Sequence, residues 1–407
     1  MSSFGNVVTL KAGQSDLSVQ VIEKGLHVFS ISFNDKNGKK QEIIIGPEDP
    51  KDQVKDRRFL HSIVGRYCNR LPDTPITLPN GQSFTPQQNG GAGTSLHGGP
   101  SSAGWDQKTF TNVSSSPSEA LFSPAERKYL AGLVEQGQAG VWEYVSPHGE
   151  GGHLGKVRTQ TAFVVEEAKG GNKEQVGAVE IIYRAELVEG EMTALNMTHH
   201  WAFNLEFSDM GRDGPCPVGD VKNHTLHFKS KDILDLAEDT ALPTGKTVPA
   251  PKSRDFSTPK KIGQDFPEGG LDDYWIFERG SGEREVLDGG VEGSDVFADI
   301  EKDKEIVAVL SSDKNNISLN FTTNQPGVQA WSGTGGYDGQ DSRRKIHGGK
   351  AVENQDDGYK VPPAFAMEFH SVYDAWMHPE LKKLGWDTVL KKGQVYNNWV
   401  RMTIKSE

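Results

Sequence analysis

The clearest pattern in the chain is an apolar residue at every second position between residues 179 and 187. These positions hold Val179, Ile181, Tyr183, Ala185 and Leu187. Successive side chains of a β-strand point to opposite faces, so this period predicts a strand with one buried face.

Shorter segments with strand-like sequence recur along the chain, bounded by Gly, Pro, Asn or Asp. They fall at residues 17–45, 161–165, 226–228, 306–310, 317–321 and 400–404. The pairs Asn37-Gly38 and Asn80-Gly81 each predict a two-residue hairpin turn. Many short strands without a regular alternation of strand and helix indicate an all-β fold, a large antiparallel sandwich or barrel. We expect one domain over residues 1–407, because strand-like sequence continues on both sides of the Gly-rich loops.

One predicted helix interrupts the strand pattern. Ser123 and Glu126 have the spacing of a capping box, with Pro124 at the first helical position, and apolar residues follow at helical spacing as far as Val134. The helix lies in a Gly- and Ser-rich region. We therefore interpret residues 112–157 as an elaborated loop or insertion outside the repeating strand pattern.

Composition and charge indicate which classes of partner are expected. The chain has 56 acidic and 44 basic residues, a net charge of -12 at pH 7. This surplus of negative charge argues against nucleic acid or an anionic membrane surface as the main partner. Hydrophobic residues make up 35% of the chain, which is ordinary for a globular protein. A neutral small molecule is the expected ligand.

Cysteine usage and the N-terminus bear on the compartment. Cys68 and Cys216 are the only cysteines, and they lie far apart without metal-site spacing, so neither a disulfide framework nor a zinc site is indicated. The N-terminus lacks a basic region followed by an apolar run, and no later segment is apolar enough to cross a bilayer. We therefore expect a cytosolic protein.

Two adjacent histidines in an aromatic and apolar setting are the first candidates for chemistry. His199 and His200 follow the 179–187 segment and precede Trp201. If they lie on a strand, they point to opposite faces, so at most one of them faces a given cavity. That one is a candidate acid or base, and the alternative is a hydrogen-bonded structural histidine.

Glu368 and two Gly-rich stretches supply further candidates. Glu368 lies in Ala-Phe-Ala-Met-Glu-Phe, an apolar setting expected to raise the carboxyl pKa toward the range of a general base. The alternative is a salt bridge to an arginine. Residues 64–71 and 89–99 place polar side chains among glycines, which suits close approach of the backbone to a ligand. The alternative there is a glycine turn with surface arginines.

Together these four stretches resemble the aldose 1-epimerase family, the galactose mutarotases. Family members carry Gly-Arg-x-x-Asn-Arg-Ile, then Asn-x-x-x-x-Leu-His-Gly-Gly, then Thr-Asn-His-x-Tyr-Phe-Asn-Leu, and finally a Glu followed by Pro-Asp-Ala. The chain holds corresponding segments in the same order, at Gly65, His97, His200 and Glu368. The resemblance implies a large antiparallel β-sandwich of the galactose mutarotase type with an open sugar cleft.

The resemblance also implies roles for six residues. The catalytic pair is His200 as the acid and Glu368 as the base. The family's sugar-contacting positions correspond to His97, Arg70, Asp272 and Gln329.

The chain departs from the family pattern beside these positions. His199 stands where the family has an asparagine. Asp272 and Asp273 occupy an Asp-His-x-Phe context whose histidine is missing here, and we take Asp272 as the sugar-contacting residue. Trp331 replaces a tyrosine and suits either stacking on a sugar ring or packing in the core.

The implied reaction interconverts the α and β anomers of free aldohexoses such as glucose or galactose. Glu368 would remove the proton from the C1 hydroxyl, and protonated His200 would deliver one to the ring oxygen. The roles would swap when the ring closes. No cofactor and no metal are expected, and the partner is the sugar itself.

Three alternatives stay open. A hexose-6-phosphate 1-epimerase would need a cationic phosphate pocket, for which Arg57-Arg58 and Arg343-Arg344-Lys345 are the available clusters. A non-catalytic sugar-binding or regulatory protein could use the same fold. A histidine metal site is disfavoured, because adjacent histidines on a strand face opposite ways.

Overall fold

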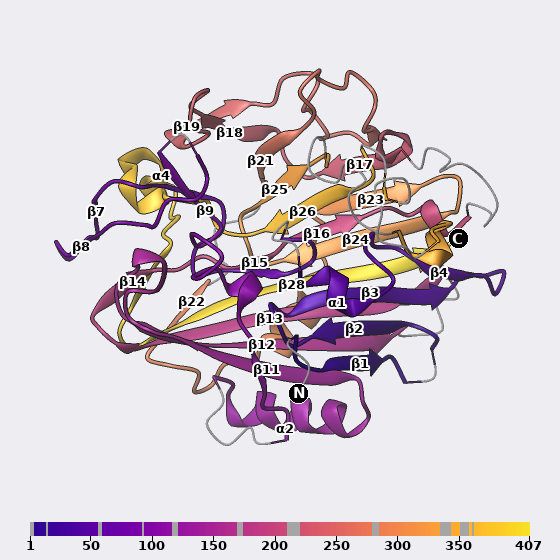
Figure 1. Ribbon diagram of the computed structural model, residues 1–407, viewed down its shortest axis with the longest axis horizontal. Helices are drawn as coiled ribbons and strands as arrows, with labels where there is room; N and C mark the ends of the chain where they lie inside the picture. Colours follow the sequence, from indigo (N-terminus) through magenta and orange to yellow (C-terminus); the bar gives the residue numbers. More distant parts are fainter. Residues whose placement is uncertain are drawn as a thin grey trace.

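Antiparallel strands are the main regular structure of the computed structural model, which describes all residues except 1–3, 14, 56–58, 92, 116–120, 169–173, 210–219, 279–284, 334–342, 351–357 and 360–361 (Figure 1). The strands form sheets of ten, six and four strands together with several two-stranded pairs. None of the described sheets closes into a barrel. Of the two all-β architectures that the sequence predicts, the sandwich is therefore the one observed.

The ten-stranded sheet is the largest layer. Its order is β10-β11-β12-β13-β28-β24-β23-β17-β20, and β22 pairs with β28 beside this path. The strands are β10 (Thr111–Asn112), β11 (Ala139–Ser146), β12 (Lys156–Glu167), β13 (Gln175–Glu189), β17 (Thr225–Phe228), β20 (Lys260–Lys261), β22 (Val286–Asp288), β23 (Ala308–Ser312), β24 (Ile317–Thr323) and β28 (Gln394–Ser406). The alternating apolar residues of the 179–187 segment all lie in β13 and pack into the main core, as predicted.

Two smaller sheets complete the sandwich. The six-stranded sheet is ordered β16-β26-β25-β21-β18-β19 and the other is ordered β1-β2-β3-β4. Their strands are β16 (Trp201–Phe203), β26 (Phe365–Phe369), β25 (Gly327–Trp331), β21 (Asp272–Ile276), β18 (Asp232–Leu236), β19 (Pro243–Pro249), β1 (Val7–Lys11), β2 (Ser18–Ile22), β3 (His27–Asn34) and β4 (Lys40–Glu42). One continuous core contains side chains from all three sheets, among them Ile31, Ile181 and Met367. The smaller sheets therefore pack against one face of the largest sheet.

Both Asn-Gly pairs lie in turns where the sequence predicts them, but each connecting segment, residues 35–39 and 78–82, has five residues instead of the predicted two. Asn37-Gly38 connects β3 and β4, and Asn80-Gly81 connects β7 (Ile76–Thr77) with β8 (Ser83–Phe84). Gly38 and Gly81 have φ angles of 75° and 85°, which glycine adopts without steric cost. The other short pairs are β5 (Ile63–Val64) with β15 (Thr198–His199), β6 (Arg70–Pro72) with β9 (Thr94–Leu96), and β14 (Met192–Ala194) with β27 (Val389–Lys391).

The predicted helix forms as α2 (Pro124–Glu135), beside β11 in Figure 1, and its capping box is present. The structure differs from the sequence interpretation in the strand that follows, because β11 is paired with β12 along its whole length. Val141 of β11 packs under α2, whereas Trp142 packs into the main core. Burial on both faces explains why this strand shows no apolar alternation.

A buried ion pair joins α2 to the sheet. The guanidinium of Arg184 in β13 donates to the Glu126 carboxylate over 2.8 Å, and neither side chain has exposed surface. Glu126 also accepts from the Ser294 hydroxyl and from the backbone N–H of Val296, the first residue of α3 (Val296–Lys302). One carboxylate therefore connects α2, α3 and the sheet.

The remaining α-helices of the described residues are short. They are α1 (Pro50–Gln53) and α4 (Pro379–Lys383). Among the described residues, no helix combines the length and the apolar composition that spanning a bilayer requires. Cys68 is a buried free thiol, whereas Cys216 lies outside the described residues.

Nine of the twelve histidines are buried. Burial lowers the pKa to about 3 for His153, His199, His224 and His347. A histidine in an unfolded chain titrates near pH 6.5, so the unfolded state binds more protons than the folded state between about pH 6.5 and pH 3. The free energy of unfolding therefore falls as pH falls through this window, by up to about 1.4 kcal/mol per pH unit for each histidine.

His153 offers a direct test. Neither of its ring nitrogens has a hydrogen-bond partner among the described residues, and the ring packs between Phe84 and Tyr67. We predict that His153→Phe reduces the dependence of unfolding free energy on pH by up to about 1.4 kcal/mol per pH unit between pH 6 and 4.5. Urea unfolding at a series of pH values measures this slope, and the difference at pH 8 isolates the packing effect. An unchanged slope would show that His153 titrates normally in the folded protein.

Candidate active site

Alternation along β26 separates the core from a polar face. Phe365, Met367 and Phe369 pack into the main core. Glu368 lies between them in sequence and therefore points to the other face of the six-stranded sheet. The Glu368 side chain is only 4% exposed, so an ionisable group is buried outside the core.

Cross-strand register places further polar side chains beside Glu368. Gln329 of β25 lies opposite Glu368, and Tyr274 of β21 lies opposite Gln329. Asp272 is two residues before Tyr274, so it shares the same face. His200 immediately precedes β16, the strand on the other side of β26. Residues far apart in the sequence thus meet on one face of one sheet.

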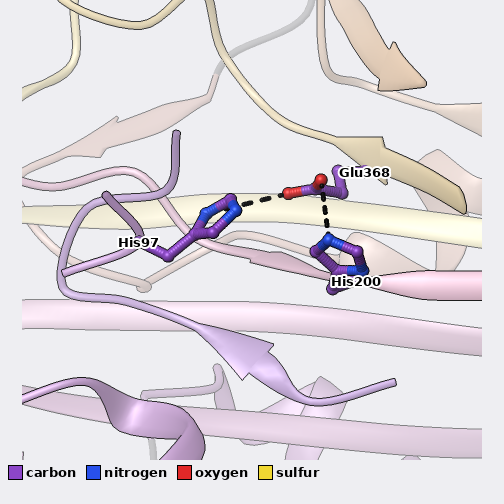
Figure 2. Close-up of side chains that lie close together, drawn as sticks. All are labelled: His97, His200 and Glu368. Carbon is purple, nitrogen blue, oxygen red and sulfur yellow. Dashed lines mark ion pairs between the residues drawn. The ribbon is translucent and has the colours of Figure 1, made fainter. Parts of the chain in front are cut away.

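The Glu368 carboxylate faces two imidazole rings (Figure 2). His200 Nε2 is 3.3 Å from one carboxylate oxygen, and His97 Nδ1 is 4.0 Å from the other. The two histidine side chains are 7% and 8% exposed, respectively. Three groups capable of proton transfer therefore share one nearly water-free space.

The two adjacent histidines have different surroundings. His199 Nδ1 lies 2.8 Å from the Tyr183 hydroxyl, and its Nε2 lies 3.2 Å from the Leu26 carbonyl oxygen. Both ring nitrogens are thus used inside the protein, as expected for a structural histidine. His200 faces Glu368 instead, in agreement with the opposite orientation that the sequence predicts.

Burial acts in opposite directions on the pKa values of the pair. It raises the pKa of Glu368 to about 8, assisted by the negative charge of Asp272 and opposed by the positive charge of Arg70. It lowers the pKa of His200 to about 4. Loss of water disfavours both the carboxylate and the imidazolium, so at neutral pH the Glu368–His200 pair holds one proton, on Glu368. The sequence analysis expects a protonated His200 instead. Transfer of this one proton from Glu368 to His200 produces that state.

Four polar side chains form a hydrogen-bonded group beside this pair. Gln329 Nε2 donates to Asp272 over 2.6 Å, and Asn69 Nδ2 donates to Gln329 Oε1 over 3.0 Å. Arg70 donates to Asn69 Oδ1 over 3.2 Å, and another of its nitrogens lies 3.8 Å from Asp272 Oδ2. The Asp272 side chain is 50% exposed. The structure thus brings all six sequence-predicted site residues together.

Three aromatic and polar neighbours complete the surroundings, two of which the sequence analysis did not single out. The Phe59 ring centroid is 4.6 Å from that of His97 and 6.2 Å from that of His200. Asn69 stands inside a quoted motif, but nothing in its local sequence indicates these contacts. Trp331 is half-buried, 6.3 Å from the His200 ring, and packs against an apolar cluster.

Several other polar groups point away from the site. Asp273 pairs with Arg254 over 2.6 Å on the opposite face of β21. Arg344 is buried, stacks on Phe29 and donates to its carbonyl oxygen. Arg343 is also buried and donates to the Gly348 carbonyl oxygen. The cluster Arg57-Arg58 lies outside the described residues.

The three central groups are also conceivable metal ligands. One ligand atom from each of His97, His200 and Glu368 can be chosen so that all three lie within 4.8 Å of one another. However, His97 Nδ1, which faces Glu368, already accepts a hydrogen bond from the Asn69 backbone N–H over 3.1 Å. Through this nitrogen His97 cannot serve as a third ligand beside His200 and Glu368, whereas zinc sites use three or four protein ligands.

Sequence comparisons give consistent matches along the chain. The family model described as aldose 1-epimerase matches residues 6–403. Galactose mutarotase from Bos taurus is 23% identical over 406 residues, which cover 98% of this chain and 95% of the relative. Aldose 1-epimerase from Escherichia coli is 22% identical over 392 residues, with coverage of 96% and 93%.

Solved structures share the fold. The aldose epimerase homologue from C. elegans has a TM-score of 0.71 at 18% identity, and the match covers 98% of this chain and 99% of that one. Galactose 1-epimerase from Lactobacillus acidophilus has a TM-score of 0.64 at 17% identity, with coverage of 98% and 94%. The predicted β-sandwich of this structural type is confirmed.

We predict that the purified protein holds no stoichiometric metal, because the Nδ1 lone pair of His97 is already engaged. Elemental mass spectrometry after gel filtration in metal-free buffer measures the content. One equivalent of zinc in the native protein, lost in His200→Asn, would contradict this prediction and place a metal at Glu368.

Proposed function

This chain belongs to the aldose 1-epimerase family, a family of isomerases, and we propose that it interconverts the α and β anomers of free aldohexoses such as glucose or galactose. The observation that carries the proposal is the Glu368 carboxyl buried 3.3 Å from the His200 imidazole. Opening a hemiacetal ring requires removal of a proton from one oxygen and delivery of a proton to another. A buried acid and base holding one proton between them can do both without a cofactor.

The proposed reaction begins with the single proton that the pair shares. Transfer from Glu368 to His200 produces a carboxylate and an imidazolium. The carboxylate takes the proton of the C1 hydroxyl while the imidazolium gives its proton to the ring oxygen, so the C1–ring oxygen bond breaks and an aldehyde forms. Rotation about the C1–C2 bond exposes the other face of the aldehyde. Ring closure returns both protons with the roles exchanged, and the enzyme is unchanged.

The neighbouring groups would hold the sugar. Arg70, Gln329 and Asp272 present hydrogen-bonding atoms next to the pair, and His97 Nδ1 lies 4.0 Å from a carboxylate oxygen of Glu368. Fixing the hydroxyls of the ring orients C1 toward the reacting groups. Arg70 also favours the carboxylate form of Glu368, which supports the base role.

The choice of a free sugar over a phosphorylated one rests on where the described cations lie. Arg343 and Arg344 are buried and donate to backbone carbonyl oxygens. A hexose 6-phosphate needs a cation directed at its phosphate. Among the described site residues, Arg70 is the cation beside the reacting pair, and it is already engaged with Asn69 and Asp272. The galactose mutarotase and aldose 1-epimerase relatives support the same choice.

We predict that Glu368→Gln and His200→Asn each lower the turnover rate by about a hundredfold to ten-thousandfold, because each removes one partner of the proton transfer. Polarimetry of freshly dissolved α-D-glucose and α-D-galactose, corrected for spontaneous mutarotation, measures the rate. Asp273→Asn is the matched control, because its side chain points to the opposite face of β21.

The outcomes separate the remaining alternatives. Acceleration of glucose 6-phosphate mutarotation without acceleration of the free sugars would contradict the proposal and support the phosphate alternative. Sugar binding by the native protein without any acceleration would support a binding or regulatory protein.

We predict a bell-shaped dependence of kcat/KM on pH, with limbs near pH 4 and pH 8. Below the acid limb both groups hold a proton and the base is lost, whereas above the basic limb neither does and the acid is lost. Asp272→Asn moves the basic limb to lower pH, because the Asp272 charge raises the pKa of Glu368. Arg70→Gln moves it to higher pH. Gln329→Ala, which changes no charge, leaves the limb in place, and identical limbs in all three variants would refute the assignment of this limb to Glu368.

A further inference from the structure

The four polar side chains beside Glu368 form a ring in which three hydrogen bonds run in one direction from Arg70 to Asp272, and a 3.8 Å ion-pair contact between these two residues closes it. Arg70 cannot accept a hydrogen bond, and ionised Asp272 cannot donate one. The two amides between them must therefore both turn their oxygens toward Arg70 and their nitrogens toward Asp272. The observed contacts follow this order, from Arg70 to Asn69 Oδ1, from Asn69 Nδ2 to Gln329 Oε1, and from Gln329 Nε2 to Asp272.

Of the four residues in this ring, Asn69 also forms backbone hydrogen bonds with His97. Its backbone N–H donates to His97 Nδ1 over 3.1 Å, and its carbonyl oxygen accepts the backbone N–H of His97 over 3.0 Å. An imidazole nitrogen that accepts a hydrogen bond carries no proton, so neutral His97 must hold its proton on Nε2.

The backbone at this point explains why an asparagine suits the position. Asn69 and His97 have φ angles of 60° and 50°, in the left-handed region that most side chains disfavour. Asparagine adopts this conformation more readily than most other residues. Asn69 immediately precedes β6 and His97 immediately follows β9, at the end of the strand pair where Arg70 lies opposite Leu96. Asn69 thus meets a conformational requirement and a hydrogen-bonding requirement together.

We propose that Asn69 is a positioning residue, whose backbone N–H selects the Nε2–H tautomer of His97 and whose side chain determines which way the Gln329 amide faces. Both effects decide where the site offers donors to a sugar and where it offers acceptors. This inference deepens the proposed function and rests on it for its catalytic part. The tautomer of His97 does not depend on any activity.

The orientation of the Gln329 amide determines which hydrogen bonds the site can form with a sugar. Gln329 Oε1 accepts from Asn69, so the amide can use its second N–H as a donor to a sugar hydroxyl. Reversal of the Gln329 amide would direct its oxygen toward the Asp272 carboxylate and exchange a donor for an acceptor. A sugar hydroxyl placed to accept would then lose its partner.

Two variants separate the backbone contribution of Asn69 from that of its side chain. Asn69→Gly keeps the left-handed backbone and the N–H that reaches His97, but removes the amide. Asn69→Asp keeps the shape but offers only acceptors when ionised, so it cannot donate to Gln329. Both variants should fold, since glycine and aspartate tolerate the conformation, and circular dichroism with thermal unfolding checks this.

The first test is nitrogen NMR of ¹⁵N-histidine-labelled protein, with His97→Asn used to assign the signals. We expect an unprotonated Nδ1 and a protonated Nε2 at His97 in the native protein and in Asn69→Gly. A protonated Nδ1 in the native protein would overturn the proposal, whatever the activity. If no aldose is turned over, the proposed function fails, while this measurement still decides the tautomer.

The second test is a double-mutant cycle on kcat/KM with the aldose that is turned over. We expect Asn69→Gly to lower kcat/KM about tenfold to a hundredfold. If Asn69 acts through Gln329, the double variant with Gln329→Ala loses about as much as Gln329→Ala alone. Losses that multiply would show that Asn69 acts independently of Gln329 and would overturn the side-chain part of the proposal.

Discussion

Burial of the Glu368 carboxyl is the constraint from which the arrangement of the site follows. In β26, Glu368 lies between Met367 and Phe369, whose side chains enter the core. The Glu368 carboxyl therefore cannot reach bulk water without disrupting the sheet. A lone buried carboxylate is costly, and this one is accommodated by protonation and by an imidazole 3.3 Å away. Arg70 and Asp272 stand close enough to act on it with opposite sign. The same burial that makes the group unusual thus makes it able to exchange protons near neutral pH.

The side chains that form the core and those that form the site lie on opposite faces of one sheet. One face of the six-stranded sheet supplies aromatic and aliphatic side chains to the core, and the other supplies the reacting groups. Because side chains alternate strictly along a strand, a residue on the polar face can change without altering its neighbours in the core. The loops that carry Asn69 and His97 then close over the polar face and bring the second histidine.

Much of this arrangement could be predicted from local sequence, because strand period, Asn-Gly turns and the capping box at Ser123 are local signals. The opposite orientations of His199 and His200 follow from the same period. The gathering of six residues into one site was implied by family resemblance, since no local rule brings residues 70 and 368 together. The contacts of Phe59 and Asn69 depend on left-handed backbone conformations and on pairing between distant loops. Strand β11 escaped prediction because both faces of its first half are buried, which removes the alternation that would reveal it.

The pairing of Arg184 with Glu126 has a consequence for how this protein can diverge. Within the region from residue 112 to residue 157, the helix α2 lies outside the strand framework, yet it supplies the partner of a fully buried cation. A lineage that shortened this region would leave the guanidinium stranded in a dry environment, which is far more costly than losing a surface helix. The region that contains α2 could therefore be deleted only if a neutral residue replaced Arg184 at the same time. The two changes would have to be inherited as a pair, and an engineer who wished to trim the protein would need to make both in one step.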